Sequence, residues 1–168
     1  GNDMKLLVAI PHRNFVSMFW ARALRTLKFP EGTGFITSVE YVLDVTRDML
    51  VYEALQDGRA SHLLFIDDDV VPLDPEAPLK MAQLMESENM GILSALYFAK
   101  KPGRKVPAAW CRAFQKPNGT WMYNPVDPDR EKTGIVQIHA AGLGFCMIDL
   151  GIFKSLEPPW FYWKKNRL

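Results

Sequence analysis

Three consecutive aspartates carry the clearest chemical signal in this sequence. Asp67, Asp68 and Asp69 directly follow the apolar run Leu63–Ile66. An unbroken run of this kind is typical of a strand buried on both faces of a mostly parallel sheet, and ligands of such sheets bind at the carboxyl ends of the strands. Adjacent carboxylates repel one another, and a divalent cation with a preference for oxygen ligands would relieve that repulsion. The alternative interpretation is a solvated acidic turn.

Composition favours one compact domain. The chain has 168 residues, of which 48% are hydrophobic, so it can build a sizeable core. A net charge of +1 gives no global argument for binding to nucleic acid or to an acidic membrane surface. Residues 1–3 precede Met4 and are consistent with a cloning remnant, so the predicted domain covers residues 4–168.

The location of the protein is predicted from its cysteines and its apolar runs. Cys111 and Cys146 lie far apart and lack the spacing of metal ligands, so we expect reduced thiols in a cytoplasmic protein. No apolar run reaches the length of a membrane span, and no signal peptide is visible. The aromatic and basic end of the chain, from Trp160 onward, is compatible with a peripheral position at a membrane. Packing or acceptor contact is the interpretation that we prefer for it.

Strand and helix patterns alternate in the first half. The expected strands are Lys5–Ile10, Gly34–Val42 and Leu63–Ile66. The expected helices start after Ser17, at about Thr46 and at Pro75, and they end before Pro30, near Gln56 and near Asn89. The N-cap candidates are Ser17 for the first helix, Asp44 or Thr46 for the second and Asp74 for the third, and Gly58 is the expected stop of the second helix.

The second half is richer in strand patterns. The expected strands are Gly91–Phe98, Val106–Phe114, Trp121–Tyr123, Ile135–Ala141 and Phe145–Ile148. Pro117–Gly119 predicts the turn of a hairpin. Lys100–Lys105 is expected to form a basic turn, and Pro125–Lys132 is expected to form a polar loop. Asp149 is an expected cap of a last short helix that reaches Leu156. Together the two halves predict an α/β sheet with an appended β-region.

Four sequence blocks, taken in order, resemble GT-A fold glycosyltransferases near family 2. They are Ile10–Asn14, Val45–Asp48, Leu63–Pro72 and Ala140–Ile148. The resemblance extends from Leu6 to about Phe161. It implies a GT-A-like (Rossmann-like) mixed, mostly parallel sheet flanked by helices, with an appended β-hairpin region. It also implies a metal-dependent glycosyltransferase that moves a sugar from a nucleotide-diphosphate donor to a glycan, lipid or small-molecule acceptor.

The resemblance implies roles for the aspartates and for one arginine. Asp67 and Asp69 match the Asp-x-Asp motif of that group, in which the later carboxylate binds Mn²⁺ or Mg²⁺. The earlier carboxylate faces the ribose or the metal shell, and Asp68 occupies the variable middle position. Arg47 matches the arginine that approaches the nucleotide base or phosphate. These assignments are expectations for a nucleotide and metal site.

Further assignments concern the base, the sugar and the acceptor. Pro11, His12 and Arg13 match the loop that walls the nucleobase. Gly142–Gly144, with Leu143 at the centre, resembles the floor of the donor-sugar and acceptor pocket, where a glycine lets a sugar approach the backbone. The candidates for acceptor binding are Trp110, Trp121 and His139.

The general base is left unassigned. In relatives, an acidic block supplies the base and a later histidine completes the metal site, and both would lie beyond Leu168. We therefore expect this chain to bind its donor but to transfer sugar slowly, because a general base typically contributes about 10²–10⁴-fold. Whether the reaction inverts or retains configuration stays open.

Several candidate residues have an ordinary structural alternative. Arg47 is equally compatible with a surface residue that pairs with Asp44 or Asp48. His139 could instead be a histidine of the hydrophobic core. Trp110 and Trp121 could instead pack over one face of the predicted hairpin. Gly142 and Gly144 are compatible with bulge positions. The residues of the basic turn Lys100–Lys105 could either be solvated or form a basic loop that covers a diphosphate.

Two other function classes compete with the transferase interpretation. A nucleotidyltransferase that makes sugar nucleotides would share the sheet and the acidic site, but it normally has a glycine-rich loop after the first strand, and Pro11–Asn14 contains no glycine. A nucleotide-sugar-binding domain without catalysis is the non-enzyme alternative. The sequence lacks the glycine fingerprints of P-loop NTPases and Rossmann oxidoreductases. Asp67–Asp69 also lacks the alternating ligands of an EF-hand.

Overall fold

A computed structural model describes residues 4–39, 42–127 and 134–162. The chain divides into two compact units. Residues 1–93 and 144–168 form the first unit, and residues 94–143 form the second.

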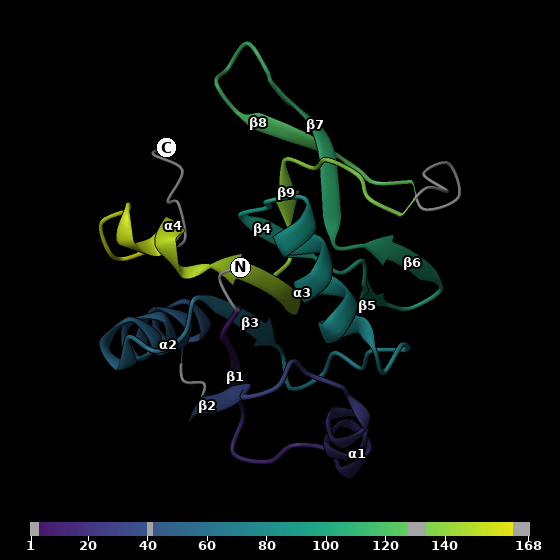
Figure 1. Cartoon of the computed structure of the whole chain (residues 1–168). Coiled ribbons are helices and arrows are strands. Elements are labelled where there is room, and N and C mark those ends of the chain that lie inside the picture. The colour runs from purple at the N-terminus through teal and green to yellow at the C-terminus, as the bar shows by residue number, and fades with distance from the viewer. Residues whose placement is uncertain (1–3, 40–41, 128–133, 163–168) are drawn as a thin grey trace. The chain divides into compact units, whose positions relative to one another are not determined.

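A five-stranded sheet in the order β2-β1-β3-β10-β4 forms the centre of the first unit (Figure 1). Its strands are β1 (Leu6–His12), β2 (Gly34–Val39), β3 (His62–Ile66), β4 (Ile92–Ser94) and β10 (Phe145–Asp149). β1 pairs in parallel with β2 and with β3, whereas β10 runs antiparallel to β3. The predicted α/β class with a mixed sheet is confirmed, and the sheet that was expected to be mostly parallel is partly parallel.

Helices follow the strands of the first unit. They are α1 (Met18–Thr26), α2 (Leu43–Asp57), α3 (Ala77–Ser87) and α4 (Leu150–Lys154). α2 packs against β1 and β2, and α4 packs against α2 and β10, so these two helices cover the same face of the sheet. Across the described ranges, no helix combines the length and the apolar character that a membrane span needs.

β3 lies inside the sheet, between β1 and β10. Leu63, Leu64, Phe65 and Ile66 have no solvent exposure at all. Burial on both faces explains why this strand is apolar without alternation. The aspartate triplet follows the best-buried strand of the unit, as the sequence predicted.

Three predicted helix ends are confirmed. The Ser17 hydroxyl accepts a hydrogen bond from the Trp20 amide at the start of α1. Gly58 ends α2 in the left-handed region with φ of 66°, a conformation that glycine adopts without a steric penalty. The Asp149 carboxylate accepts a hydrogen bond from the Gly151 amide and caps α4.

Two predicted helix starts are wrong. α2 begins after Val42, so neither Asp44 nor Thr46 is its N-cap; the Thr46 hydroxyl instead donates to the Val42 carbonyl. α3 begins at Ala77 rather than at Pro75. Asp74 stabilises the turn before that helix, where its carboxylate accepts from the Glu76 amide and pairs with Lys80. In both places a polar side chain forms a hydrogen bond with a backbone group near the start of the helix without being its N-cap.

The second unit consists of small antiparallel sheets. One contains β5 (Phe98–Lys101) and β6 (Arg104–Pro107), and the other contains β7 (Ala109–Gln115), β8 (Trp121–Pro125) and β9 (Ala140–Ala141). β7 and β8 form the predicted hairpin, and Gly119 in its turn has φ of 81°. The appended β-hairpin region of the prediction is confirmed.

Several predicted elements of the second half are wrong in extent. The expected buried strand Gly91–Phe98 is reduced to β4, in which Ile92 is exposed. The basic turn Lys100–Lys105 is the β5–β6 hairpin, with Gly103 at positive φ, and the expected strand Val106–Phe114 is split between β6 and β7. Of Ile135–Ala141, the last two residues form a strand. Short apolar runs without a long-range partner do not specify a strand by themselves.

Some expectations fall on residues that the structure does not describe. They are residues 40–41 of the expected strand Gly34–Val42, residues 128–132 of the predicted polar loop, and the end of the chain from residue 163 onward. The side chains of Lys100, Lys101 and Lys105 also lie outside the described part.

Candidate functional site

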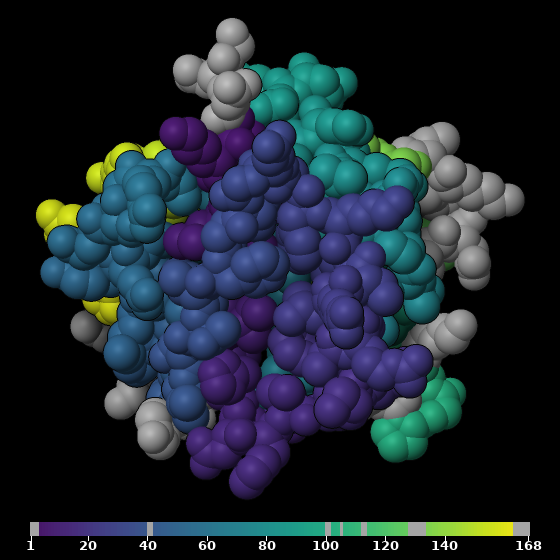
Figure 2. Space-filling model, turned by 60° about the horizontal axis from the view of Figure 1, so that its bottom comes forward, coloured from purple at the N-terminus to yellow at the C-terminus, as the bar shows by residue number. Residues whose placement is uncertain are grey.

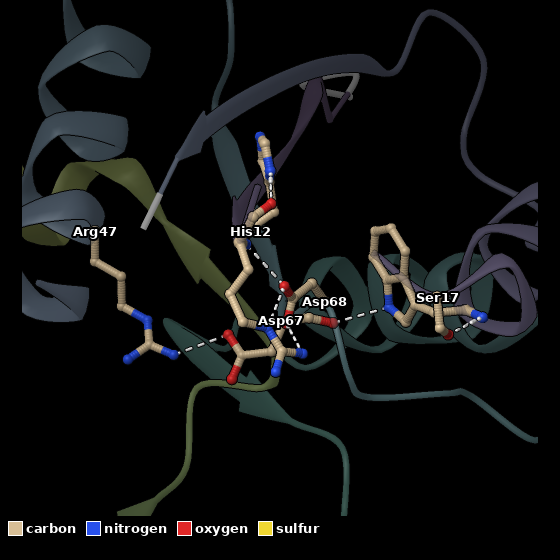
Figure 3. Close-up of polar contacts among 7 residues, drawn as sticks. His12, Ser17, Arg47, Asp67 and Asp68 are labelled. Atoms are coloured by element: carbon tan, nitrogen blue, oxygen red, sulfur yellow. Dashed lines mark hydrogen bonds and ion pairs between the residues drawn. The ribbon is translucent and has the colours of Figure 1, made fainter. Parts of the chain in front are cut away.

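Charged side chains converge at the carboxyl edge of the sheet of the first unit. β1 ends at His12 and β3 ends at Ile66, and the two strands are parallel neighbours. The loops that follow them therefore meet at the same edge. Figure 3 shows Asp67 and Asp68 at this edge, with Arg47 facing Asp67.

Asp68 is held by Arg13. Its Oδ2 atom accepts hydrogen bonds from the Arg13 backbone N–H at 2.9 Å and from Nε at 3.0 Å, and its Oδ1 atom accepts from Nη2 at 3.0 Å. The Asp68 side chain is only 7% exposed, whereas that of Arg13 is 61% exposed. A fork of this kind is the strongest geometry for an arginine–carboxylate pair. The middle aspartate therefore fixes the loop after β1.

The pKa of Asp68 follows from this contact. Burial raises the pKa of the carboxyl, but the hydrogen bonds from Arg13, together with the charges of Arg13 and His12, outweigh that rise. The net pKa lies below its usual value, so Asp68 is a stable carboxylate at neutral pH.

Asp67 is paired with Arg47. The Arg47 Nη2 atom donates to Asp67 Oδ1 at 2.9 Å, and the arginine side chain is 12% exposed. Its guanidinium carbon also lies 6.0 Å from the centre of the Phe65 ring. Burial raises the pKa of Asp67 above its usual value, and the charge of Arg47 and its hydrogen bond oppose that rise.

Arg47 keeps unused hydrogen-bonding capacity. Its Nε atom is buried and has no hydrogen-bond partner within the described part of the chain. A buried donor without a partner costs free energy, typically about 1–3 kcal/mol. The Arg47 side chain is 12% exposed, so it brings a mostly buried positive charge to the acidic edge of the sheet.

The backbone of the triplet is tied to its surroundings on two sides. The Asp67 N–H donates to the Gly144 carbonyl at 2.9 Å, and the Asp67 carbonyl accepts from Trp20 Nε1 at 2.9 Å. Gly144 directly precedes β10, and Trp20 is the buried residue of α1. These two hydrogen bonds fix the backbone of Asp67 relative to β10 and α1, and a preorganised site requires a backbone that is fixed in this way.

Asp69 differs from the other two aspartates because it is exposed. Within the described ranges, no group of three or more His, Cys, Asp or Glu side chains is arranged to hold a metal ion. Mg²⁺ is commonly bound through one or two carboxylates together with substrate phosphates. The exposed Asp69 could bind a cation in this way, together with the phosphates of a diphosphate. The described side chains could not form a complete metal site by themselves.

The remaining residues of the predicted nucleobase wall lie in the loop after β1. Pro11 is fully buried and supports the strand end. The His12 Nδ1 atom lies 2.7 Å from the Arg13 carbonyl, which acts as the acceptor. His12 and Arg13 thus flank the acidic triplet, and Arg13 binds it directly.

The predicted sugar and acceptor residues Trp110, His139, Gly142 and Leu143 belong to the second unit. The His139 N–H donates to the Trp110 carbonyl at 2.9 Å, so His139, which directly precedes β9, lies beside β7. His139 is exposed, and the alternative of a core histidine is therefore wrong. Trp121 is also exposed and opens β8.

Gly142 has a packing reason of its own. A Cβ at this position would clash with the side chain of Tyr97, and it would lie 3.3 Å from the Ala108 Cβ. The Gly142 N–H also donates to the Ala108 carbonyl. The role of this glycine toward a sugar stays a prediction.

Neither structural alternative for Arg47 matches the structure. Asp44 accepts a hydrogen bond from the Val45 amide. The Asp48 carboxylate accepts from the backbone amides of Trp160 and Phe161. Arg47 pairs with Asp67 instead, a contact that the sequence analysis did not name.

The C-terminal aromatic residues are packing residues as far as the structure describes them. The Phe161 ring lies edge-on to Phe65 at 5.7 Å, and the Trp160 ring lies edge-on to Phe153 at 5.8 Å. Asp48 anchors the backbone of the same segment. The preferred packing interpretation of this segment is confirmed for Trp160 and Phe161.

Comparison with known proteins identifies a shared fold. No family profile matches the sequence. No curated protein matches it either. The crystal structure of A197 from STIV is similar to this chain, with a TM-score of 0.68 and 18% sequence identity over 95% of this chain and 72% of that one. At this level of identity the similarity shows the fold alone.

Proposed function

We propose that this chain is a glycosyltransferase of the GT-A type, which uses a nucleotide-diphosphate sugar and a divalent cation, Mn²⁺ or Mg²⁺. The observation that supports it most strongly is the aspartate triplet at the end of the central buried strand, in which two carboxylates are paired with arginines and the third is exposed. The fold shared with A197 is compatible with this proposal.

The two arginines suit a diphosphate. Cleavage of a sugar nucleotide leaves negative charge on the diphosphate, and preorganised cations stabilise such charge as it develops. Arg47 supplies a fixed positive charge with an unused Nε donor, and the exposed guanidinium of Arg13 lies at the same edge. Asp68 and Asp67 hold these guanidinium groups in place before the ligand arrives.

Asp69 is the proposed protein ligand of the cation, with Asp67 next to it. A bound divalent cation would add Lewis-acid stabilisation of the leaving diphosphate. His12 and Arg13 are the proposed contacts of the nucleobase and ribose, and the buried Pro11 supports the loop that carries them.

A thermal melt with ligands tests this proposal. A ligand at 100 times its dissociation constant stabilises the native state by about 2.7 kcal/mol, which corresponds to about 5–10 °C for a chain of this size. The wild-type chain should show such a shift with Mn²⁺ and one of a panel of nucleoside diphosphates together, and a smaller shift with either alone. The Asp69→Asn variant should lose the metal-dependent part.

A matched control is Asp57→Asn, which removes an exposed carboxylate that pairs with Arg59 at the other end of α2. This variant should keep the full ligand shift. Absence of any shift in the wild-type chain, with all nucleoside diphosphates and both cations, would exclude the proposed site.

Turnover separates the transferase from its competitors. Incubation with sugar nucleotides should release nucleoside diphosphate, slowly without an acceptor and faster with the right one. Binding without release would identify a nucleotide-sugar-binding domain. Formation of a sugar nucleotide from a sugar phosphate and a nucleoside triphosphate would identify a nucleotidyltransferase.

A further inference from the structure

A run of large apolar side chains is exposed where the chain enters α1. Phe15 is 89% exposed, Met18 74% and Phe19 71%, and Val16 between them is also exposed. Single exposed apolar residues are normal on a protein surface, but a contiguous group marks a surface that meets a partner. Figure 2 shows the residues of α1, in indigo, at the surface toward the viewer.

The fold does not need these side chains. α1 is anchored through its opposite side, where Trp20 is buried and its Nε1 atom donates to the Asp67 carbonyl. Ser17 caps the helix through the Trp20 amide. The helix is therefore fixed in an orientation that leaves Met18 and Phe19 in solvent.

The same helix carries exposed positive charge. Met18, Arg22 and Arg25 are exposed and follow the i, i+4, i+7 spacing of one helix face. The segment 12–28 contains no Asp or Glu. Within the described residues, neither Arg22 nor Arg25 forms an ion pair, whereas Arg13 pairs with Asp68 and Lys28 with Glu76.

We propose that this surface, formed by Phe15, Val16, Met18, Phe19, Arg22 and Arg25, docks on an anionic lipid surface. Phenylalanine and methionine side chains enter the boundary between headgroups and acyl chains, and arginines beside them bind anionic headgroups. A helix of nine residues lies in the plane of the interface and does not cross it. Charge complementarity favours this partner over a neutral apolar surface.

Docking would also orient the candidate site. Phe15 follows Arg13 by two residues, and Trp20 of the same helix binds the backbone of Asp67. The edge of the sheet that bears the aspartate triplet would then lie close to the lipid surface. Lipid binding needs neither nucleotide nor cation, so this proposal is tested independently of the transferase reaction.

Sedimentation of the full chain with vesicles tests the proposal. The wild-type chain should bind vesicles of phosphatidylcholine with phosphatidylserine, bind pure phosphatidylcholine more weakly, and dissociate as salt is added. The double variant Phe15→Ser/Phe19→Ser should lower the partition coefficient by at least about tenfold, because two phenyl rings no longer leave water. Each of Arg22→Ala and Arg25→Ala should lower it about fivefold.

The matched control is Met49→Ser/Tyr52→Ser, which removes two exposed apolar side chains from α2. It should bind vesicles as the wild type does, and thermal melts should show that every variant is folded. Three results would overturn the proposal: no binding of the wild-type chain, equal losses in the control, or binding that ignores both phosphatidylserine and salt. The first of these would leave a protein partner as the occupant of this surface.

Discussion

The backbone amide and the guanidinium of Arg13 both bind the carboxylate of Asp68, across 55 positions of sequence. This contact joins the loop after β1 to the loop after β3. Asp68 is therefore a structural member of the triplet, Asp67 is partly exposed, and Asp69 is the most exposed member. The three like charges coexist because Arg13 and Arg47 compensate two of them.

Asp68→Asn should destabilise the fold more than Asp69→Asn. Replacement of Asp68 removes the charge opposite Arg13 and one acceptor of the fork, and we expect a loss of about 1–3 kcal/mol in the free energy of unfolding. Asp69 is exposed, and its replacement should change that free energy by no more than about 0.5 kcal/mol. Urea unfolding of both variants measures the difference. Equal losses would show that the Arg13 fork does not support the fold.

Arg47→Ala should weaken binding of a nucleoside diphosphate by about 1–3 kcal/mol, the usual size of a charge-assisted hydrogen bond. It should also raise the pKa of Asp67 further, because the charge of Arg47 is what opposes the effect of burial. Calorimetric titration measures the first effect. Arg59→Ala, at an exposed arginine that follows α2, is the control and should bind normally. If the affinity of Arg47→Ala for the nucleoside diphosphate is unchanged, Arg47 does not contact the ligand and its role is the ion pair with Asp67.

Local signals account for the parts of the fold that the sequence predicted well. The apolar run of β3 reports burial on both faces, and Ser17, Gly58 and Asp149 end or begin helices through contacts within a few residues. Such contacts depend little on the rest of the chain. The acidic edge was predictable for the same reason, since it follows from one strand and the residues next to it.

Long-range contacts account for what was missed. The fork of Arg13 on Asp68 and the pair of Arg47 with Asp67 join residues from different elements, and no spacing rule reveals such partners. The one available signal was charge balance, because three adjacent carboxylates need cations and both arginines occur in the blocks that resemble glycosyltransferases. Gly91–Phe98 was overpredicted as a strand because its apolar content alone does not show which segment pairs with it.

His62 should make stability depend on pH at the opposite end of β3. Burial lowers the pKa of His62 below its usual value of about 6.5, and Asp149 and Glu86 oppose that shift. The unfolded chain therefore binds a proton more readily than the folded chain. The contribution of His62 is constant above about pH 6.5, and stability falls as the pH decreases through that value. Urea midpoints at about pH 7.5 and about pH 5.5 measure this decrease.

The variant His62→Gln isolates this contribution. Glutamine does not titrate, so the decrease between the two pH values should be smaller in the variant than in the wild type. The difference between the two proteins removes the effect of all other titrating groups. An identical decrease in both proteins would contradict the lowered pKa of His62.

Cys146 should report opening of the sheet. Both cysteines are free, but burial raises the pKa of the Cys146 thiol to about 12, while the charge of Arg47 opposes that rise. The reactive species is the thiolate, so a Cys111→Ser variant should take up iodoacetamide only when β10 exposes its thiol. Addition of Asp68→Asn should accelerate this labelling, since a less stable fold opens more often. Rapid labelling of the folded Cys111→Ser protein, at a rate that Asp68→Asn leaves unchanged, would show that Cys146 is accessible without opening.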